Sequence, residues 1–554
     1  MNSRFQHWLG SGDPWIWINA GAVSFSLIMV FGLLGLIGAH GLGHFWPSEV
    51  VQFKLVEGQD EAFILGEVVD QELASAARLR SLGTKVPQGQ EFVQRLLLKI
   101  GNRDVFGLDF KWINELVIEQ TARPESVIVL EREEWGNFYG FATGIIEAEK
   151  QLSIAPEQVW TELSVRLERR HELQSQIKKI EKSEIGGINF QLERLRLRKR
   201  SLELKNALTA NAGAEIEARE QQLQAEYETL NAELSRLYQE QARDVLLAKT
   251  VGGDEVRLPL AQLVRAYRPN QMSVGEKIAY YLAKLIEFVS TEPREANTEG
   301  GVFPAIFGTV MMVLIMSLFV APFGVVAAIY LREYARQGPV TRTIRIAVNN
   351  LAGVPSVVYG VFGLGFFVYF LGGSIDRLFY AAALPAPTFG TPGMLWSSLT
   401  LAILTVPVVI VATEEGLARI PRAIRDGSLA LGATKAETLW RIVLPMATPA
   451  MMTGLILAVA RAAGEVAPLM MVGVVKLAPS LPLDGNAPFL HLDRKFMHLG
   501  FHIYDVGFQS PNVEAARPLV YATALLLIVI IVALNLAAIM IRNRLREKYS
   551  GGEG

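Results

Sequence analysis

The sequence has no cysteine among its 554 residues. This absence excludes disulfide bonds, thiolate metal sites and cysteine nucleophiles. It also suits a chain that faces an oxidising compartment, because no bridge can form there. The seven histidines are scattered along the chain, so we predict neither a metal site nor a bound cofactor.

A phosphate-binding loop for ATP is also missing. The two candidate stretches, Gly83-Thr84-Lys85 and Gly432-Ala433-Thr434-Lys435, lack the spaced glycines of a Walker motif. The formal net charge of −2 gives no general attraction to nucleic acid. We therefore expect a chain that is not an enzyme and that binds no nucleic acid.

Long apolar runs, in contrast, are abundant, and hydrophobic residues make up 51% of the chain. As a helix, the segment Ile18–Ala39 is long enough to cross about 30 Å of hydrocarbon. A cleaved signal peptide is the alternative for this run, but the run is longer than a usual signal core and no small-x-small cleavage site follows it. Five further runs predict five more spans: Val302–Leu331, Leu351–Leu371, Met394–Ala412, Thr448–Val475 and Leu519–Ile541.

Basic residues cluster in alternate connections between these runs. They follow the second, fourth and sixth runs, whereas residues 372–393 contain Arg377 alone. By the positive-inside rule, we expect a multi-pass membrane protein with both termini in the cytoplasm. Residues 46–300 would then lie on the outer side.

Between residues 46 and 149 the pattern changes to short runs rich in Val, Ile and aromatic residues, which predict strands. These runs are Val50–Val56, Phe63–Val69, Phe92–Ile100, Glu115–Glu119, Ser126–Glu131 and Phe138–Ile145. Near Gly252-Gly253-Asp254 a strand–turn–strand pattern is expected to return to the same β-rich domain.

Residues 156–248, inserted between these strand patterns, are charged and have a helical period. Large apolar residues at four-three spacing predict an antiparallel coiled-coil hairpin. Asn211-Ala212-Gly213 is expected to form its reversal, and Gly186-Gly187 a hinge or break within one arm. Such a charged run is either a structural arm with a solvated face or a contact surface for a partner.

Residues 273–290 carry apolar residues on one helical face, so this helix should lie on the membrane surface or pack on the soluble domain. The linker 291–301, rich in Pro, Asn and Gly, is the clearest boundary. The predicted organisation is a tail and first transmembrane helix (1–45), an extracytoplasmic β-rich domain with the hairpin (46–300), a membrane domain with five transmembrane helices (301–545) and a flexible tail (546–554).

A polar and basic loop, Glu414–Pro445, lies between the fourth and fifth apolar runs. A helix–turn–helix would satisfy the backbone hydrogen bonds of this loop from within, with the turn at Gly432-Ala433. Several apolar residues would give these short helices a face that fits neighbouring helix ends or a groove on a soluble partner: Leu429, Leu431, Leu439, Ile442 and Leu444.

This loop resembles the coupling loop of ABC importer permeases, in which E-A-A is followed by x-G-A and then by I-x-L-P. The three parts read Asp426-Gly427-Ser428, Leu431-Gly432-Ala433 and Ile442-Val443-Leu444-Pro445, so only the first part is degraded. Residues Asn349–Gly360 and Ala460–Pro468 are similar to the phosphate-transport permeases of the PstA type. The resemblance covers roughly residues 300–545.

The resemblance implies a type I ABC importer permease of the bacterial inner membrane, all-α with six transmembrane helices, that moves inorganic phosphate. It implies as partners an ATP-binding subunit that hydrolyses ATP, a second permease of the PstC type, a periplasmic phosphate-binding protein and membrane lipid. The loop at about 414–448 would contact the ATPase through Asp426, Gly427, Ser428, Gly432, Ala433, Leu444 and Pro445.

A membrane-anchored sensor or scaffold that uses the coiled coil is the alternative function. The degraded Asp426-Gly427-Ser428 segment is the sequence feature that favours it.

Arg461 and Glu465 are charged residues near the middle of the predicted fifth span. Residues four apart lie on one face of a helix, and charges inside a membrane are expensive unless they are paired or line a wet path. The two residues either form an ion pair that holds helices together or belong to the translocation path.

Overall fold

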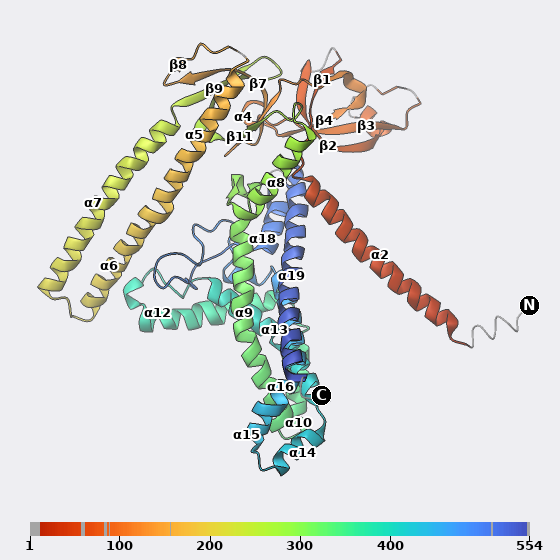
Figure 1. Ribbon diagram of the computed structural model, residues 1–554, viewed down its shortest axis with the longest axis vertical. Helices are drawn as coiled ribbons and strands as arrows, with labels where there is room; N and C mark the ends of the chain where they lie inside the picture. Colours follow the sequence, from red (N-terminus) through yellow and green to blue (C-terminus); the bar gives the residue numbers. More distant parts are fainter. Residues whose placement is uncertain are drawn as a thin grey trace, which may run out of the picture.

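The computed structural model describes residues 11–56, 61–81, 86–87, 89–155, 157–510 and 513–550 of the chain. Residues 1–10 of the predicted N-terminal tail lie outside this range, as do residues 551–554 of the C-terminal one. The molecule is elongated, with β-sheets at one end, long helices in the middle and the short helices α14 and α15 at the other end (Figure 1).

The first sheet contains five antiparallel strands in the order β4-β3-β2-β1-β5. Its core is formed by inward-facing aliphatic and aromatic residues such as Phe53 and Leu98, because side chains alternate between the faces of a strand. The strand bounds are β1 Val50–Leu55, β2 Phe63–Ser75, β3 Phe92–Lys99, β4 Phe110–Asn114 and β5 Ile118–Ala122.

Most of the predicted strands are confirmed, but the one at Glu115–Glu119 is wrong. Residues Glu115–Val117 form a 3₁₀ turn between β4 and β5. Strand β4 was not predicted, because its five residues FKWIN mix one lysine and one asparagine with apolar residues and give a weak strand signal.

The second sheet has the order β10-β9-β7-β6-β11, and the two-residue strand β8 pairs with β7. Helix α5 covers one face of this sheet, where Val159, Leu163 and Leu167 pack on residues such as Ile128 and Phe138. The strands are β6 Ile128–Arg132, β7 Phe138–Glu147, β8 Lys150–Gln151, β9 Asp244–Lys249, β10 Glu255–Pro259 and β11 Leu263–Tyr267. The predicted strand–turn–strand is thus confirmed as β9 and β10.

A long helical hairpin is inserted between β8 and β9 and runs down beside the membrane domain (Figure 1). One arm is α5 Val159–Lys179, a π-helical turn Ile180–Ile185 and α6 Gly186–Leu204; the other is α7 Ala210–Gln241. The arms pack through Leu173, Ile177, Ile180 and Leu237. Two antiparallel helices are therefore present, while coiled-coil packing between them stays a prediction.

The predicted reversal of this hairpin is wrong by a few residues. Asn211-Ala212-Gly213 lies in the first turn of α7, and the chain reverses in residues 205–209. The Thr209 hydroxyl accepts a hydrogen bond from the Ala212 amide, so a threonine cap begins the helix before the glycine. The predicted break at Gly186-Gly187 is a helical continuation that follows the π-helical turn.

Helix α8, Val274–Ser290, joins the second sheet to the linker, and a capping box between Ser273 and Glu276 starts it. Its polar side faces the β-rich domain, as shown by the hydrogen bond that Tyr280 donates to Glu131. Ile278, Leu282 and Ile286 on its other side are 47–65% exposed. The predicted apolar face therefore exists, but it does not pack on the soluble domain.

The linker after α8, between the β-rich domain and the membrane domain, has an unusual backbone. Three successive residues, Glu295, Ala296 and Asn297, have positive φ angles of 40°, 53° and 75°, which cost energy in residues with a Cβ. The Asn297 side chain donates to the Lys476 carbonyl (2.9 Å) and to the Asp505 carboxylate (3.2 Å). Lys476 in turn pairs with Asp505 at 3.1 Å, so the linker is fixed to the chain between α16 and α19 of the membrane domain.

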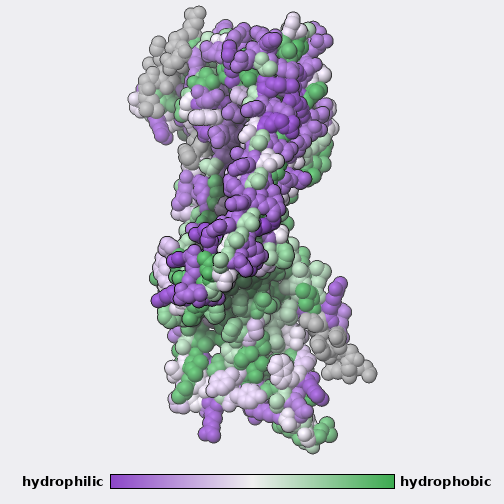
Figure 2. Space-filling model, turned by 90° about the vertical axis from the view of Figure 1, so that its left-hand side faces the viewer, coloured by the Kyte–Doolittle hydropathy of each residue, from purple (hydrophilic) through white to green (hydrophobic). Residues whose placement is uncertain are grey.

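Six helices are long and apolar enough to cross a membrane, which confirms the predicted number in the described part of the chain. Figure 2 shows hydrophobic residues gathered over the lower half of one face and hydrophilic ones over the upper half. The helices are α2 Asp13–Gly43, α9 Phe303–Ile329, α11 Ser356–Phe362 with its extension through α12 Gly373–Phe379, α13 Met394–Arg419, α16 Leu444–Gly464 and α19 Val513–Ser550.

Two helix ends differ from the prediction. Helix α16 ends at Gly464 and not at Val475. Pro468 has no amide hydrogen to donate to the carbonyl four residues earlier, that of Gly464, and the chain turns extended at Glu465. Helix α19 continues to Ser550, so residues 546–550 of the predicted flexible tail are helical.

Candidate coupling loop and charged sites

The loop between α13 and α16 forms a helix–turn–helix at the end of the molecule opposite the β-sheets (Figure 1). Helix α14 spans Arg422–Ala430 and the short helix α15 spans Lys435–Thr438. Gly432 lies between them with a φ of 89°, a conformation in which glycine avoids the strain of a Cβ. No atom lies within 4 Å of the position that its Cβ would take, so the turn faces open space.

Buried polar contacts fix the shape of this loop. The hydroxyls of Ser428 and Thr438 lie 2.8 Å apart and are both buried, which joins α14 to the end of α15. Arg425 pairs with Glu333 at 2.9 Å and donates to the carbonyls of Ile420 and Leu417. The loop is thus held against the end of α9.

The residues named from the sequence separate into two groups. Ser428 and Leu444 are buried and Pro445 lies at the start of α16, so these three shape the loop. Asp426, Gly427 and Gly432 are exposed, and Ala433 is half-buried.

The predicted apolar face of the loop is likewise divided. Leu439 and Leu444 point into the membrane domain, with 4% and 9% exposure, whereas Leu431 is 90% exposed. Trp440, which the sequence analysis did not single out, is 73% exposed. The loop therefore exposes large apolar side chains on its surface.

Sequence reasoning also missed two contacts that stabilise the loop. Thr434 and Glu437 form a capping box, which their spacing could have indicated. The Arg425–Glu333 pair joins residues 92 positions apart, and no local pattern signals it.

Arg461 and Glu465 are brought together, but not in the middle of a span. Their side chains approach to 3.5 Å and are 33% and 20% exposed. Arg461 lies in the last turn of α16, and Glu465 is the residue that caps its end, with an extended ψ of 133°. The pair therefore sits where the helix gives way to irregular chain.

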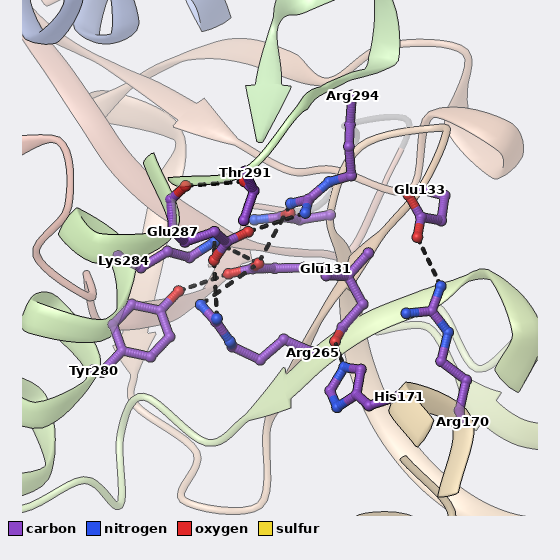
Figure 3. Close-up of polar contacts among 12 residues, drawn as sticks. Glu131, Glu133, Arg170, His171, Arg265, Tyr280, Lys284, Glu287, Thr291 and Arg294 are labelled. Atoms are coloured by element: carbon purple, nitrogen blue, oxygen red, sulfur yellow. Dashed lines mark hydrogen bonds and ion pairs between the residues drawn. The ribbon is translucent and has the colours of Figure 1, made fainter. Parts of the chain in front are cut away.

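A second cluster of charges, at the junction of the β-rich domain and the linker, was not predicted (Figure 3). Glu131 of β6 accepts hydrogen bonds from Tyr280 (2.7 Å) and Lys284 (2.5 Å) of α8. Glu287 of α8 pairs with Arg265 of β11 and Arg294 of the linker, each at 2.9 Å. This network joins a sheet, a helix and the linker.

The network holds Glu131 in its ionised form. Burial alone would raise the pKa of this carboxyl, but the positive charges of Lys284 and Arg265 outweigh burial and lower the pKa to about 2.

Comparisons with known proteins identify the membrane part. Residues 320–547 match the family described as binding-protein-dependent transport system inner membrane component. The chain is 35% identical over 247 residues to phosphate transport system permease protein PstA 1 of Mycobacterium tuberculosis (strain CDC 1551 / Oshkosh), covering 44% of this chain and 71% of that protein.

Two further relatives agree with this match. The PstA permease of Mycobacterium leprae is 34% identical over 254 residues, covering 46% of this chain and 74% of that protein. The PstC permease of Xylella fastidiosa (strain 9a5c) is 32% identical over 223 residues, covering 38% and 68%. The chain thus belongs to the binding-protein-dependent transport system inner membrane components, as a multi-pass permease of the PstA type, and not to a family of enzymes.

Proposed function

We propose that the chain is the membrane-spanning subunit of an ATP-driven importer of inorganic phosphate. Its identity of 35% to a protein named as a phosphate permease is the observation that carries this proposal. A second permease of the PstC type would complete the translocation path, and a periplasmic phosphate-binding protein would deliver the substrate. A separate ATPase would hydrolyse ATP.

The loop at 414–448 is the proposed contact with that ATPase. It lies at the end of the molecule where the basic residues gather, and it presents Leu431 and Trp440 to water. By the positive-inside rule this end and both termini face the cytoplasm. The β-sheets at the other end in Figure 1, and the helical hairpin that descends from them, would then be periplasmic.

The hairpin lies against outer connections of the permease. Helix α6 contacts the turn Ala381–Ala383, and the Phe190 ring lies 6.0 Å from that of His491. A binding protein or second permease that approaches the outer face would therefore meet this hairpin. We propose that the outer domain contributes to substrate capture and that the channel is formed by the membrane helices.

Phosphate uptake tests the function. Cells that lack this chain should lose most uptake of radiolabelled phosphate at low external concentration, and the intact gene should restore it. Sulfate uptake is the control and should not change. Normal phosphate uptake without the chain would support the sensor or scaffold function instead.

Arg461 and Glu465 are proposed to line the translocation path. The guanidinium offers paired donors that suit phosphate oxygens, and Glu465, at 3.5 Å, would orient it and limit the strength of anion binding. In the double variant Arg461→Leu/Glu465→Met, which removes both charges together, the chain should fold and bind the ATPase but transport phosphate at least about tenfold more slowly, as expected for the loss of about 1.4 kcal/mol or more of anion stabilisation.

The matched control is Arg236→Leu/Glu240→Met on α7. This pair has the same four-residue spacing and a 3.2 Å contact on an exposed surface, so uptake should stay normal. Normal uptake in the Arg461/Glu465 double variant as well would show that this pair only joins helices.

A further inference from the structure

A cavity of about 750 Å³ lies where the outer domain meets the membrane domain. Its upper wall is formed by β2, β3, α8 and the linker, and its lower wall by the end of α2 and the start of α19. None of the residues assigned to coupling or to the translocation path lines it.

The lower wall belongs to the first and the last of the candidate membrane-spanning helices in the described chain, α2 and α19. The position of a Cβ on Gly41 would be 2.9 Å from the Tyr521 carbonyl, and the rings of His40 and Tyr521 are 5.2 Å apart, so α2 and α19 touch here. Below this contact α2 diverges from the other helices, and its apolar side chains are exposed (Figure 1). Because such side chains require lipid, the cavity opens beside the outer ends of lipid-facing spans.

Aromatic residues support this position in the bilayer. Trp46, at the cavity wall, is 44% exposed and lies just after the apolar part of α2. Tryptophan and tyrosine favour the level of the lipid headgroups, where one end of the ring is apolar and the other is hydrated.

The charges of the cavity are mixed, with an excess of carboxylates. Seven carboxylates and five ammonium or guanidinium groups line it. Glu131 and Glu287 are compensated by the network described above. Among the described residues, five lining groups form no ion pair within 4.0 Å: the exposed Asp70, and Glu67, Glu299, Lys99 and Arg517.

The groups without an ion pair belong to two different walls of the cavity. Arg517 is on α19, beside the lipid-facing helices, whereas Glu67 and Glu299 belong to β2 and to the linker. Burial raises the pKa of both carboxyls. Burial would lower the pKa of Lys99, but Glu299 and Glu67 outweigh burial and raise it, so the lysine stays charged.

We propose that this cavity binds the headgroup of a zwitterionic phospholipid of the outer leaflet, with its phosphate near Arg517 and its ammonium group near Glu67 and Glu299. The acyl chains would leave between α2 and α19. A headgroup that carries both charges matches this cavity, in which Arg517 lies on a membrane helix and the carboxyl groups of Glu67 and Glu299 belong to the β-rich domain and the linker. A purely anionic headgroup would bring its charge toward the excess carboxylates, and like charges repel. The inference rests on the outward orientation of this end in the proposed function.

Lipid retained by the purified full-length chain tests the proposal. After solubilisation from an equal mixture of phosphatidylethanolamine and phosphatidylglycerol, native mass spectrometry should show at least about a tenfold preference for phosphatidylethanolamine. Glu67→Gln/Glu299→Gln should abolish the preference, and Arg517→Leu should reduce retention of both lipids. Glu72→Gln, an exposed carboxylate on the same strand as Glu67, should change nothing. Equal retention of the two lipids by the unaltered chain, or an unchanged preference in the double variant, would overturn the proposal.

A second measurement needs no variant and therefore does not depend on variant folding. Phosphatidylethanolamine with a photoreactive acyl chain should cross-link to α2 or α19 near the cavity, within residues 39–46 or 517–522. Soluble phosphoethanolamine at millimolar concentration should not prevent this cross-link. Cross-links confined to other helices, or full competition by the soluble headgroup, would contradict a lipid site. Because transport is not measured, failure here leaves the proposed import function intact.

Discussion

Replacing Leu431 with aspartate is expected to separate the chain from its ATPase and to abolish phosphate uptake. Leu431 is 90% exposed, so the change should not disturb folding of the chain itself. Burial of a leucine in a partner groove contributes about 1.5–3 kcal/mol, and an unpaired carboxylate in that groove adds a further cost. A total of about 3 kcal/mol corresponds to a loss of roughly 100-fold in affinity.

Co-purification of the ATPase with a tagged chain measures this effect. Leu204→Asp is the control, because Leu204 is a 50% exposed leucine at the tip of the hairpin, far along the chain from the loop. Gly432→Trp should give the same result, since a φ of 89° strains any residue with a Cβ and the indole would fill the open space beside the turn. Normal ATPase recovery with both variants would exclude this loop as the contact.

Glu131→Gln is expected to destabilise the outer domain by about 3–5 kcal/mol, the usual effect of removing one partner from a buried ion pair. Glutamine has nearly the same shape and can still accept a hydrogen bond from Tyr280. Glutamine cannot neutralise the positive charges of Lys284 and Arg265, which would then both depend on the carboxylate of Glu287. The lowered pKa of Glu131, about 2 against an ordinary 4.5, gives a similar value of about 3 kcal/mol.

This destabilisation should depend on pH in a defined direction. Because the folded-state pKa is lowered, the stability from Glu131 is present above about pH 4.5 and is lost as the pH falls toward 2. The difference between the unaltered chain and Glu131→Gln should therefore shrink over that interval. Pulse proteolysis of residues 46–300 in the purified full-length chain, at increasing urea, measures it.

Glu72→Gln provides the matched comparison for stability. Glu72 pairs with Arg95 at 3.1 Å in the same domain, but its side chain is 48% exposed. Exposed pairs contribute about 0–1 kcal/mol. If the two substitutions lowered stability equally, the buried network would not be what holds the sheet, α8 and the linker together.

Features encoded in neighbouring residues could be predicted from the sequence. The apolar runs gave six spans because a membrane helix needs only about 20 apolar residues in a row. Strand positions followed from local composition, and Gly432 marked the turn of the loop. The reversal of the hairpin was misplaced because Gly213 is a stronger turn signal than the Thr209 cap that begins α7.

Contacts between distant residues could not be predicted in this way. Glu131, Arg265 and Glu287 come from a strand, another strand and a helix, and only the folded chain shows that they meet. The end of α16 was misjudged because apolar residues continue past Gly464, although Pro468 stops the helix. Consequently Arg461 and Glu465 were expected at mid-membrane and lie instead at a helix end.

The linker and the loop between α13 and α16 are joined by one helix. Residues Phe303–Tyr334 form 32 residues of helix, about 48 Å long at 1.5 Å per residue. The first turn of this helix follows the linker, in which Asn297 is hydrogen-bonded to Asp505. In its last turn, Glu333 forms an ion pair with Arg425 of α14. A helix resists compression along its axis and bends most easily where proline removes a hydrogen bond. If one end of this helix is displaced sideways, the helix must therefore either bend at Pro322 or move its other end in the opposite direction.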